Sequence, residues 1–160
     1  METPPKKFFG PAFLLAQIGA HAASKFGERI AALGLTPPDA GIFRLLAASQ
    51  GISQQDLAEK LGIHPSRLVA ILDELESRAM VERQPNPGDR RQYALHLTHK
   101  GRETFTKIGL ISREHQDALC ASLTNAEREK LTELLQKIAE EQGLTPGVHP
   151  GYRRLRSKIS

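Results

Sequence analysis

The chain has 160 residues, of which 39% are apolar and 25% charged, so it can form a packed core and is not expected to be disordered as a whole. A single cysteine excludes an internal disulfide framework, which rules out small disulfide-bonded secreted folds and favours a reducing, cytoplasmic compartment. The net charge of +4 comes from the end of the chain, because residues 149–160 hold four basic and no acidic side chains and residues 1–148 are neutral overall.

Residues 1–34 are expected to form a dimerisation helix. From Phe8 to Ser24 the chain carries no Asp, Glu, Lys or Arg, so a helix here has no charged face to turn towards water. A chain of this size is too small to bury such a helix on all sides by itself. A second copy of the chain is therefore expected to cover it, which predicts a homodimer.

The same N-terminal stretch imitates a secretory signal peptide, because two lysines precede an apolar run and an A-x-A pattern follows at residues 20–22. Gly10 and Pro11 interrupt the run, and helix-spaced apolar residues continue beyond the pattern at Phe26 and Ile30. We therefore interpret the segment as a retained helix, and it is too short to span a bilayer.

Residues 35–78 predict three short helices. Thr36 and two prolines begin the first, which runs to about Ala48. Ser53 caps the second, residues 54–61, which ends at a glycine. The third runs from Pro65 to about Arg78, and its apolar residues fall on one stripe at helical spacing: Leu68, Ile71, Leu72 and Leu75.

From Met80 the hydrophobic period changes to two, which predicts a β-hairpin as far as Leu97 with a long, proline-stiffened tip at residues 85–89. Thr98 and Thr124 then cap two further helices. Residues 146–160 follow as a basic tail, and the glycines and prolines near its start predict a mobile end.

Short helices followed by a hairpin predict a mainly α fold with a small β-hairpin wing, a winged helix-turn-helix over residues 35–97. Helix 65–78 is the predicted reading helix, because its small residues Ser66 and Ala70 let the backbone approach base edges, while Arg67 reaches a phosphate or a guanine. The alternative is an ordinary amphipathic helix with a solvated face, since helix 65–78 carries a net charge of −1.

The predicted wing carries positive charge near its tip, on Arg90 and Arg91. Asp89 lies two residues before Arg91, so its carboxylate can hold that guanidinium by a charge-assisted hydrogen bond and aim it at a minor groove. A surface ion pair of little energetic value is the alternative interpretation.

Four motifs occur in one order along this region: DLAEKLGI (56–63), LDELESRAMVER (72–83), GDRR (88–91) and LTHKG (97–101). With them, residues 35–105 resemble the multiple antibiotic resistance regulator (MarR) family of bacterial transcription factors. The resemblance implies a homodimer on a palindromic DNA operator, in which the N-terminal helix interlocks with C-terminal dimerisation helices, residues 98–145. It also implies repression that a small molecule or an oxidant relieves.

The resemblance also assigns DNA-binding positions. Reading positions fall on Ser66, Arg67 and Ala70, and the wing position on Arg91, which Asp89 steadies and Arg90 accompanies. Phosphates are expected opposite two residues at the start of the supporting helix, Ser53 and Gln54.

Three departures from the family pattern concern the reading helix. Val69 and Ala70 replace a pair that is usually more polar, and Glu74 stands where a basic residue is common, so the operator sequence is not transferable from relatives. Ala79 replaces a glycine, and a left-handed residue there costs alanine roughly 1 kcal/mol, which leaves a different helix ending open.

The resemblance places five residues around an effector cleft: Phe13, Gln17, His21, Phe43 and His115. Histidines of an ordinary core are the alternative for the two imidazoles. Cys120 is interpreted as a buried inert thiol rather than a redox sensor. His96 and His99 lack further ligands nearby in sequence, so no metal site is expected.

The sequence contains no G-x-S-x-G, P-loop, H-E-x-x-H or G-x-G-x-x-G motif, so neither an enzyme nor a cofactor is expected. The predicted function is a homodimeric, sequence-specific DNA-binding repressor that a small-molecule effector releases. Its two reading helices would enter successive major grooves about 10 base pairs apart. The alternative is a winged-helix interaction or dimerisation module that does not bind DNA.

Overall fold

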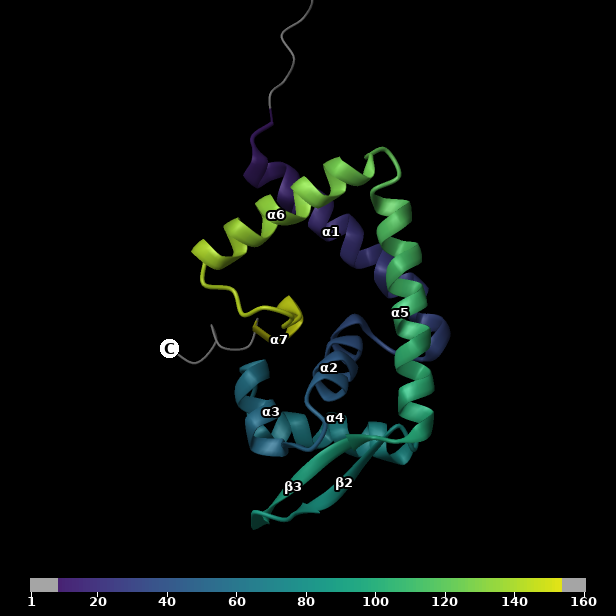
Figure 1. The fold of residues 1–160 in the computed structure, drawn as a ribbon, viewed down its shortest axis with the longest axis vertical. Coiled ribbons are helices and arrows are strands. Elements are labelled where there is room, and N and C mark those ends of the chain that lie inside the picture. Colours follow the sequence, from purple (N-terminus) through teal and green to yellow (C-terminus); the bar gives the residue numbers. More distant parts are fainter. Residues whose placement is uncertain (1–8, 154–160) are drawn as a thin grey trace, which may run out of the picture.

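The computed structural model describes residues 9–153 (Figure 1). The elements in chain order are α1 (Pro11–Ile30), the 3₁₀ helix η1 (Ala31–Leu33), α2 (Pro37–Ala48), β1 (Ile52–Ser53), α3 (Gln54–Leu61), α4 (Pro65–Ser77), β2 (Val81–Asn86), β3 (Asp89–Leu97), α5 (His99–Leu119), α6 (Asn125–Glu141) and α7 (Pro150–Arg153). The predicted mainly α winged helix-turn-helix is therefore confirmed.

The molecule has a compact reading lobe and a more open helical part. In Figure 1, α2, α3, α4 and the hairpin lie together at one end, and α5 leads from the hairpin towards α1 and α6 at the other end. The core lies in the reading lobe, where α2, α3, α4 and the sheet supply most of the fully buried side chains: Ile42, Phe43, Leu46, Leu57, Leu61, Leu68, Leu72, Leu75, Leu95 and Leu97.

The open part leaves apolar side chains uncovered within one chain. The only buried residue of α1 is Ile30, and α6 has none. Ile18 on α1 is 51% exposed and Leu134 on α6 is 47% exposed. None of the helices in the described part of the chain is both long and apolar enough to cross a membrane.

The predicted helix caps are present. The Ser53 hydroxyl accepts a hydrogen bond from the Asp56 amide at 3.0 Å, and the Thr98 hydroxyl accepts one from the Gly101 amide at 3.0 Å. At the start of α6 the Glu127 carboxylate accepts from the Thr124 amide at 2.8 Å, the reciprocal arm of a capping box. These bonds explain why helix starts were readable from the sequence, because both partners lie within three residues.

The wing is tighter at its tip than the sequence predicted. Strands β2 and β3 pair antiparallel, and β1 adds a short third strand on the far side of β3. The strand β2 continues through Pro85 and Asn86, so only two residues form the turn. Pro85 fits there because β2 is an edge strand and its missing N–H breaks no ladder bond.

Ala79 takes the left-handed conformation, with φ of 55°, and is the only residue besides glycine with a positive φ in the described chain. The Ala79 amide donates to Glu76 O at 2.8 Å and the Met80 amide to Leu75 O at 3.0 Å, which is a Schellman ending. The helix therefore ends as it would with glycine, and the alternative of a different ending is wrong.

The prediction of a mobile tail from residue 146 is wrong for its first part. The chain folds back after α6 so that α7 packs beside α2 (Figure 1), and Tyr152 is fully buried. The Tyr152 hydroxyl donates a hydrogen bond to Pro38 O at 2.6 Å. Glycine and proline predicted the loop correctly. The burial of Tyr152 was not predictable, because one isolated apolar side chain forms no repeating pattern in the sequence. Residues 154–160, which hold most of the basic charge, lie outside the described residues.

Candidate nucleic-acid interface

The reading helix α4 presents a small, exposed face at its N-terminal half. His64 caps the helix, because its Nδ1 accepts a hydrogen bond from the Ser66 amide at 3.2 Å and lies 2.7 Å from the Ser66 hydroxyl. Ser66 and Ala70 are four residues apart, share one side of the helix and are both exposed. The structure thus leaves these two predicted reading positions accessible to a duplex.

Arg67 does not lie on that face. Its guanidinium carbon is 5.8 Å from the centroid of the Tyr152 ring, so the side chain is turned towards the C-terminal segment. Its Nη1 atom is buried and has no hydrogen-bond partner among the described residues. The sequence could not anticipate this placement, because the partner ring lies far along the chain.

Two of the three acidic residues of α4 pair with an arginine of the wing. The Arg83 guanidinium forms ion pairs of 2.7 Å with both Asp73 and Glu76. It also donates to the Val69 carbonyl at 3.3 Å. The Arg83 side chain is only 14% exposed, while the two carboxylates are 60% and 43% exposed. The negative charge that argued against DNA binding is therefore offset by a cation from the adjacent strand.

Sequence reasoning assigned no role to Arg83 and missed this one. A guanidinium that meets two carboxylates three residues apart on a helix is a recognisable pattern only once strand and helix are side by side. No local signal identifies the pair in advance.

Ser53 and Gln54, the two residues expected opposite phosphates, both bind groups of the protein itself. Ser53 is 5% exposed, and its hydroxyl is occupied as the α3 cap. The Gln54 side-chain oxygen accepts from Arg83 Nε at 3.2 Å. The cap prediction is confirmed, but both side chains serve the packing of α3 against the wing and α4. Gln54 thereby joins the Arg83 network, together with Asp73, Glu76 and the Val69 carbonyl.

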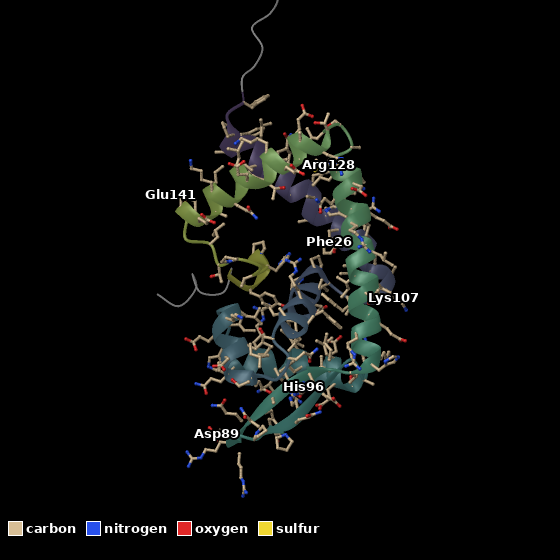
Figure 2. The ribbon with its side chains drawn as sticks, in the orientation of Figure 1. Phe26, Asp89, His96, Lys107, Arg128 and Glu141 are labelled. Atoms are coloured by element: carbon tan, nitrogen blue, oxygen red, sulfur yellow. The ribbon has the colours of Figure 1, made fainter. Side chains whose placement is uncertain are left out.

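The wing tip carries its two arginines in an irregular stretch of β3. Tyr93 pairs with Pro85 and Asp89 with Asn86, so residues 90–92 bulge out between these two pairs. Arg90 and Arg91 are exposed, and Figure 2 shows Asp89 at the end of the wing farthest from α6. The tip therefore projects two cations away from the body of the reading lobe.

Asp89 steadies the backbone rather than the guanidinium. Its Oδ1 accepts a hydrogen bond from the Arg91 amide at 2.9 Å. Within the described chain it forms no ion pair with the Arg91 side chain, so the expected charge-assisted bond is wrong. The short Asx-type bond is favoured because it closes a local ring, whereas an exposed ion pair gains little. Asp89 thus sets the bulge from which Arg91 projects.

The five residues expected around an effector cleft differ widely in burial. Phe43 is fully buried in the core of the reading lobe, whereas Phe13 is 51% exposed on α1 and stacks on Phe9 at 4.9 Å. Gln17 is also exposed on α1.

His21 and His115 do lie near one another. Partial burial lowers the pKa of His115, and the charges of Arg29 and His21 lower it further. The His115 ring also lies 5.4 Å from the ring of Phe26. These two helices, α1 and α5, therefore bring one part of the expected cleft together.

A cavity of about 250 Å³ lies beside α2 and contains none of these five residues. Its walls come from α1, α2 and the segment that leads into α7: Phe26, Pro37, Ala40, Gly41, Arg44, Gly147, Val148, His149 and Pro150. The C-terminal segment therefore forms one wall of this cavity.

The remaining candidate ligands stay apart. Among residues 9–153, no group of three or more His, Cys, Asp or Glu side chains is placed to hold a metal ion. His99 pairs with Glu103 at 3.1 Å, and the His96 ring lies against Gly51. Cys120 is half-buried at the end of α5, where its carbonyl accepts from Arg128 Nε at 3.2 Å.

Comparison with known proteins agrees with this geometry. A family model described as MarR family matches residues 33–92. A Thauera aromatica protein named for transcriptional regulation of the hcr operon is 33% identical over 114 residues, which cover 71% of this chain and 68% of that protein.

Solved structures share the fold. The transcriptional repressor CouR, bound to a 23-mer DNA duplex, has a TM-score of 0.73 and 33% identity, covering 81% of this chain and 92% of that one. A MarR family protein of Mycobacterium tuberculosis, in complex with salicylic acid, has a TM-score of 0.65 and 25% identity, covering 82% and 98%. With its winged helix-turn-helix and these relatives, the chain belongs to the MarR family of transcriptional regulators.

Proposed function

We propose that this protein is a homodimeric, sequence-specific DNA-binding repressor. The observation that carries the proposal is the Arg83 network, which places a cation between Asp73 and Glu76 on the reading helix, next to a wing tipped by two arginines. Carboxylates without a nearby cation would repel phosphates, and the Arg83 guanidinium reduces this repulsion on the reading helix. CouR, the relative bound to a DNA duplex, supports the same role.

In this proposal residues 35–97 form the DNA-binding lobe. The exposed face with Ser66 and Ala70 reads base edges in the major groove, and Arg90 and Arg91 reach the adjacent minor groove. Residues 1–34 and 98–145 form the dimerisation lobe, because their apolar side chains stay uncovered in one chain. Two reading helices then address half-sites about 10 base pairs apart.

We further propose that a small molecule releases the repressor. The relative crystallised with salicylic acid supports a ligand response. An effector that binds better to one spacing of the two reading helices shifts the population towards a form that no longer fits both half-sites. His21 and His115 are the positions we assign to this response, because the charge of His21 on α1 acts on His115 on α5, whose ring lies beside Phe26 of α1.

The proposed role is binding rather than catalysis, and the proposed place is the cytoplasm, where the operator of a bacterial regulator lies. The relatives are transcriptional regulators, which supports the first part of this statement. The lone cysteine in 160 residues is compatible with a reducing compartment.

The test begins with selection of bound fragments from random or genomic DNA, followed by affinity measurements at several salt concentrations. Arg91→Ala is expected to weaken binding most at A/T-rich flanks, because a narrow minor groove attracts the guanidinium. It is also expected to reduce the slope of log affinity against log salt by about 0.9 for each wing. Arg113→Ala, on the exposed side of α5, is the control that removes the same charge elsewhere.

Unchanged binding in Arg91→Ala would contradict the wing assignment. A full chain that binds no duplex even in dilute buffer would contradict the proposal as a whole and leave the interaction-module alternative.

A further inference from the structure

The C-terminal segment, residues 147–152, is seated on α2 by a specific contact. Tyr152 is fully buried, and its hydroxyl donates to Pro38 O at 2.6 Å. Burial, with the nearby Asp39 carboxylate as the second cause, raises the pKa of the phenol far above its ordinary value, so the hydroxyl keeps the proton that it donates.

The segment approaches α2 at Gly41. A Cβ atom at Gly41 would lie 3.6 Å from the His149 Cβ and 3.9 Å from the Tyr152 ring, which is ordinary contact distance. The segment therefore packs closely against α2 over both of its contact residues. We call residues 147–152 the C-terminal latch.

The C-terminal latch also reaches the reading helix. The Arg67 guanidinium lies over the Tyr152 ring at 5.8 Å, and the Arg67 Nη1 is buried without a hydrogen-bond partner among the described residues. A buried guanidinium N–H that lacks an acceptor is unfavourable, whereas a phosphate oxygen satisfies it with a charge-assisted bond. A nearby phosphate would therefore supply the hydrogen-bond acceptor that the Arg67 guanidinium lacks.

The position of Arg67 allows such an exchange. It follows Ser66 on the first turn of α4, the part of the helix that the proposed function places nearest to DNA. Its side chain leaves the helix about 100° around the axis from Ser66, and an arginine is long enough to turn from a flanking partner to the backbone of a bound duplex.

We propose that the C-terminal latch withholds Arg67 from DNA. While Tyr152 is seated, Arg67 stays against its ring; when the segment leaves, Arg67 turns to a phosphate and DNA binding strengthens. This inference rests on the proposed DNA-binding function. It gives the C-terminal segment a regulatory role, since anything that unseats Tyr152 raises the affinity of the same reading helix.

The experiment locks and releases the segment in the full-length dimer. Gly41→Cys with His149→Cys, in a Cys120→Ala background, places two thiols at the Cβ separation that a disulfide requires. Tyr152→Ala is the released form. The locked form is expected to bind the selected operator at least about threefold more weakly than the released form, with a salt slope smaller by about 1.8 for the two copies of Arg67.

Two controls keep the outcome interpretable. The same double-cysteine protein after reduction shows whether the lock itself, rather than the substitutions, causes the change, and each single cysteine variant should not respond to oxidant. Adding Arg67→Ala to both forms is expected to abolish the difference between them, which a merely structural role of Tyr152 would not do.

Equal affinity and equal salt slope in the locked and released forms would overturn the inference, as would tighter binding by the locked form. If Tyr152→Ala lowers the thermal midpoint so far that it unfolds, the oxidised and reduced forms of the double-cysteine protein replace that comparison. Failure of the wild-type chain to bind any duplex would instead contradict the proposed function itself.

Discussion

At the scale of single residues, Ala79 shows how a fold tolerates a strained position. It closes α4 in the left-handed region, with φ of 55°, where a Cβ atom crowds the neighbouring carbonyl. The neighbouring Met80 is buried, and Thr98 donates to Ala79 O at 2.6 Å. These contacts fix the turn, so the chain accepts the strain rather than a different path between the reading helix and the wing.

Ala79→Gly is expected to stabilise the protein by about 1 kcal/mol, less a few tenths for the greater freedom of glycine in the unfolded chain. The measurement is the urea midpoint at fixed protein concentration, with an unchanged m-value. Ala70→Gly is the matched control, because residue 70 is helical, and there the same substitution should destabilise by about 1 kcal/mol. A lower midpoint for Ala79→Gly would mean that the strain is absent.

At the scale of elements, Arg83 joins three parts of the reading lobe. It lies on β2 and binds Gln54 on α3 as well as Asp73 and Glu76 on α4. Because the guanidinium is planar and has several donors, it fixes the orientation of the wing relative to α3 and α4. The same guanidinium thus links the wing to the reading helix and pairs with two carboxylates of that helix.

Arg83→Met is expected to weaken operator binding by about tenfold or more, because two carboxylates lose their cation beside the phosphates and the wing loses its anchor. Quantitative DNA titration at constant salt measures the change. Arg113→Met removes an equal charge from the exposed side of α5 and should leave affinity within about twofold. Equal effects of the two variants would show that only net charge matters.

At the scale of the whole molecule, one chain is incomplete. The helices α1 and α6 expose large apolar side chains, while the reading lobe buries its own. Exposed apolar surface of this kind marks an interface rather than a solvated face. A dimer through these helices would bury it and hold two reading lobes at a fixed separation.

Ile18→Glu and Leu134→Glu, each placed on an uncovered apolar face, are expected to convert the dimer into a monomer at micromolar concentration, because an unpaired charge is costly to bury. Sedimentation equilibrium measures the mass. Gln136→Glu is the control, since residue 136 lies on the opposite side of α6 from Leu134 and the other apolar residues. Dimers in all three variants would place the interface elsewhere.

The sequence by itself determined the main helices and the β-hairpin, and their order along the chain. Capping residues such as Ser53 and Thr98 bind backbone amides within three residues. Apolar residues recur every 3.6 positions in a helix and every two positions in a strand, so a short stretch of sequence is enough to show the pattern. Such signals are local, so they survive without knowledge of the tertiary fold. The motifs of residues 35–105 likewise sufficed to identify the family.

Only the tertiary structure decided what several site residues do. Arg83 meets Gln54 across 29 positions, and Tyr152 meets Pro38 across 114. Through these contacts Gln54 joins an internal network, and Arg67 turns to the C-terminal latch instead of the exposed face. The partner of a polar or aromatic side chain depends on which groups lie close to it in the folded chain. The spacing of residues along the sequence does not contain this information.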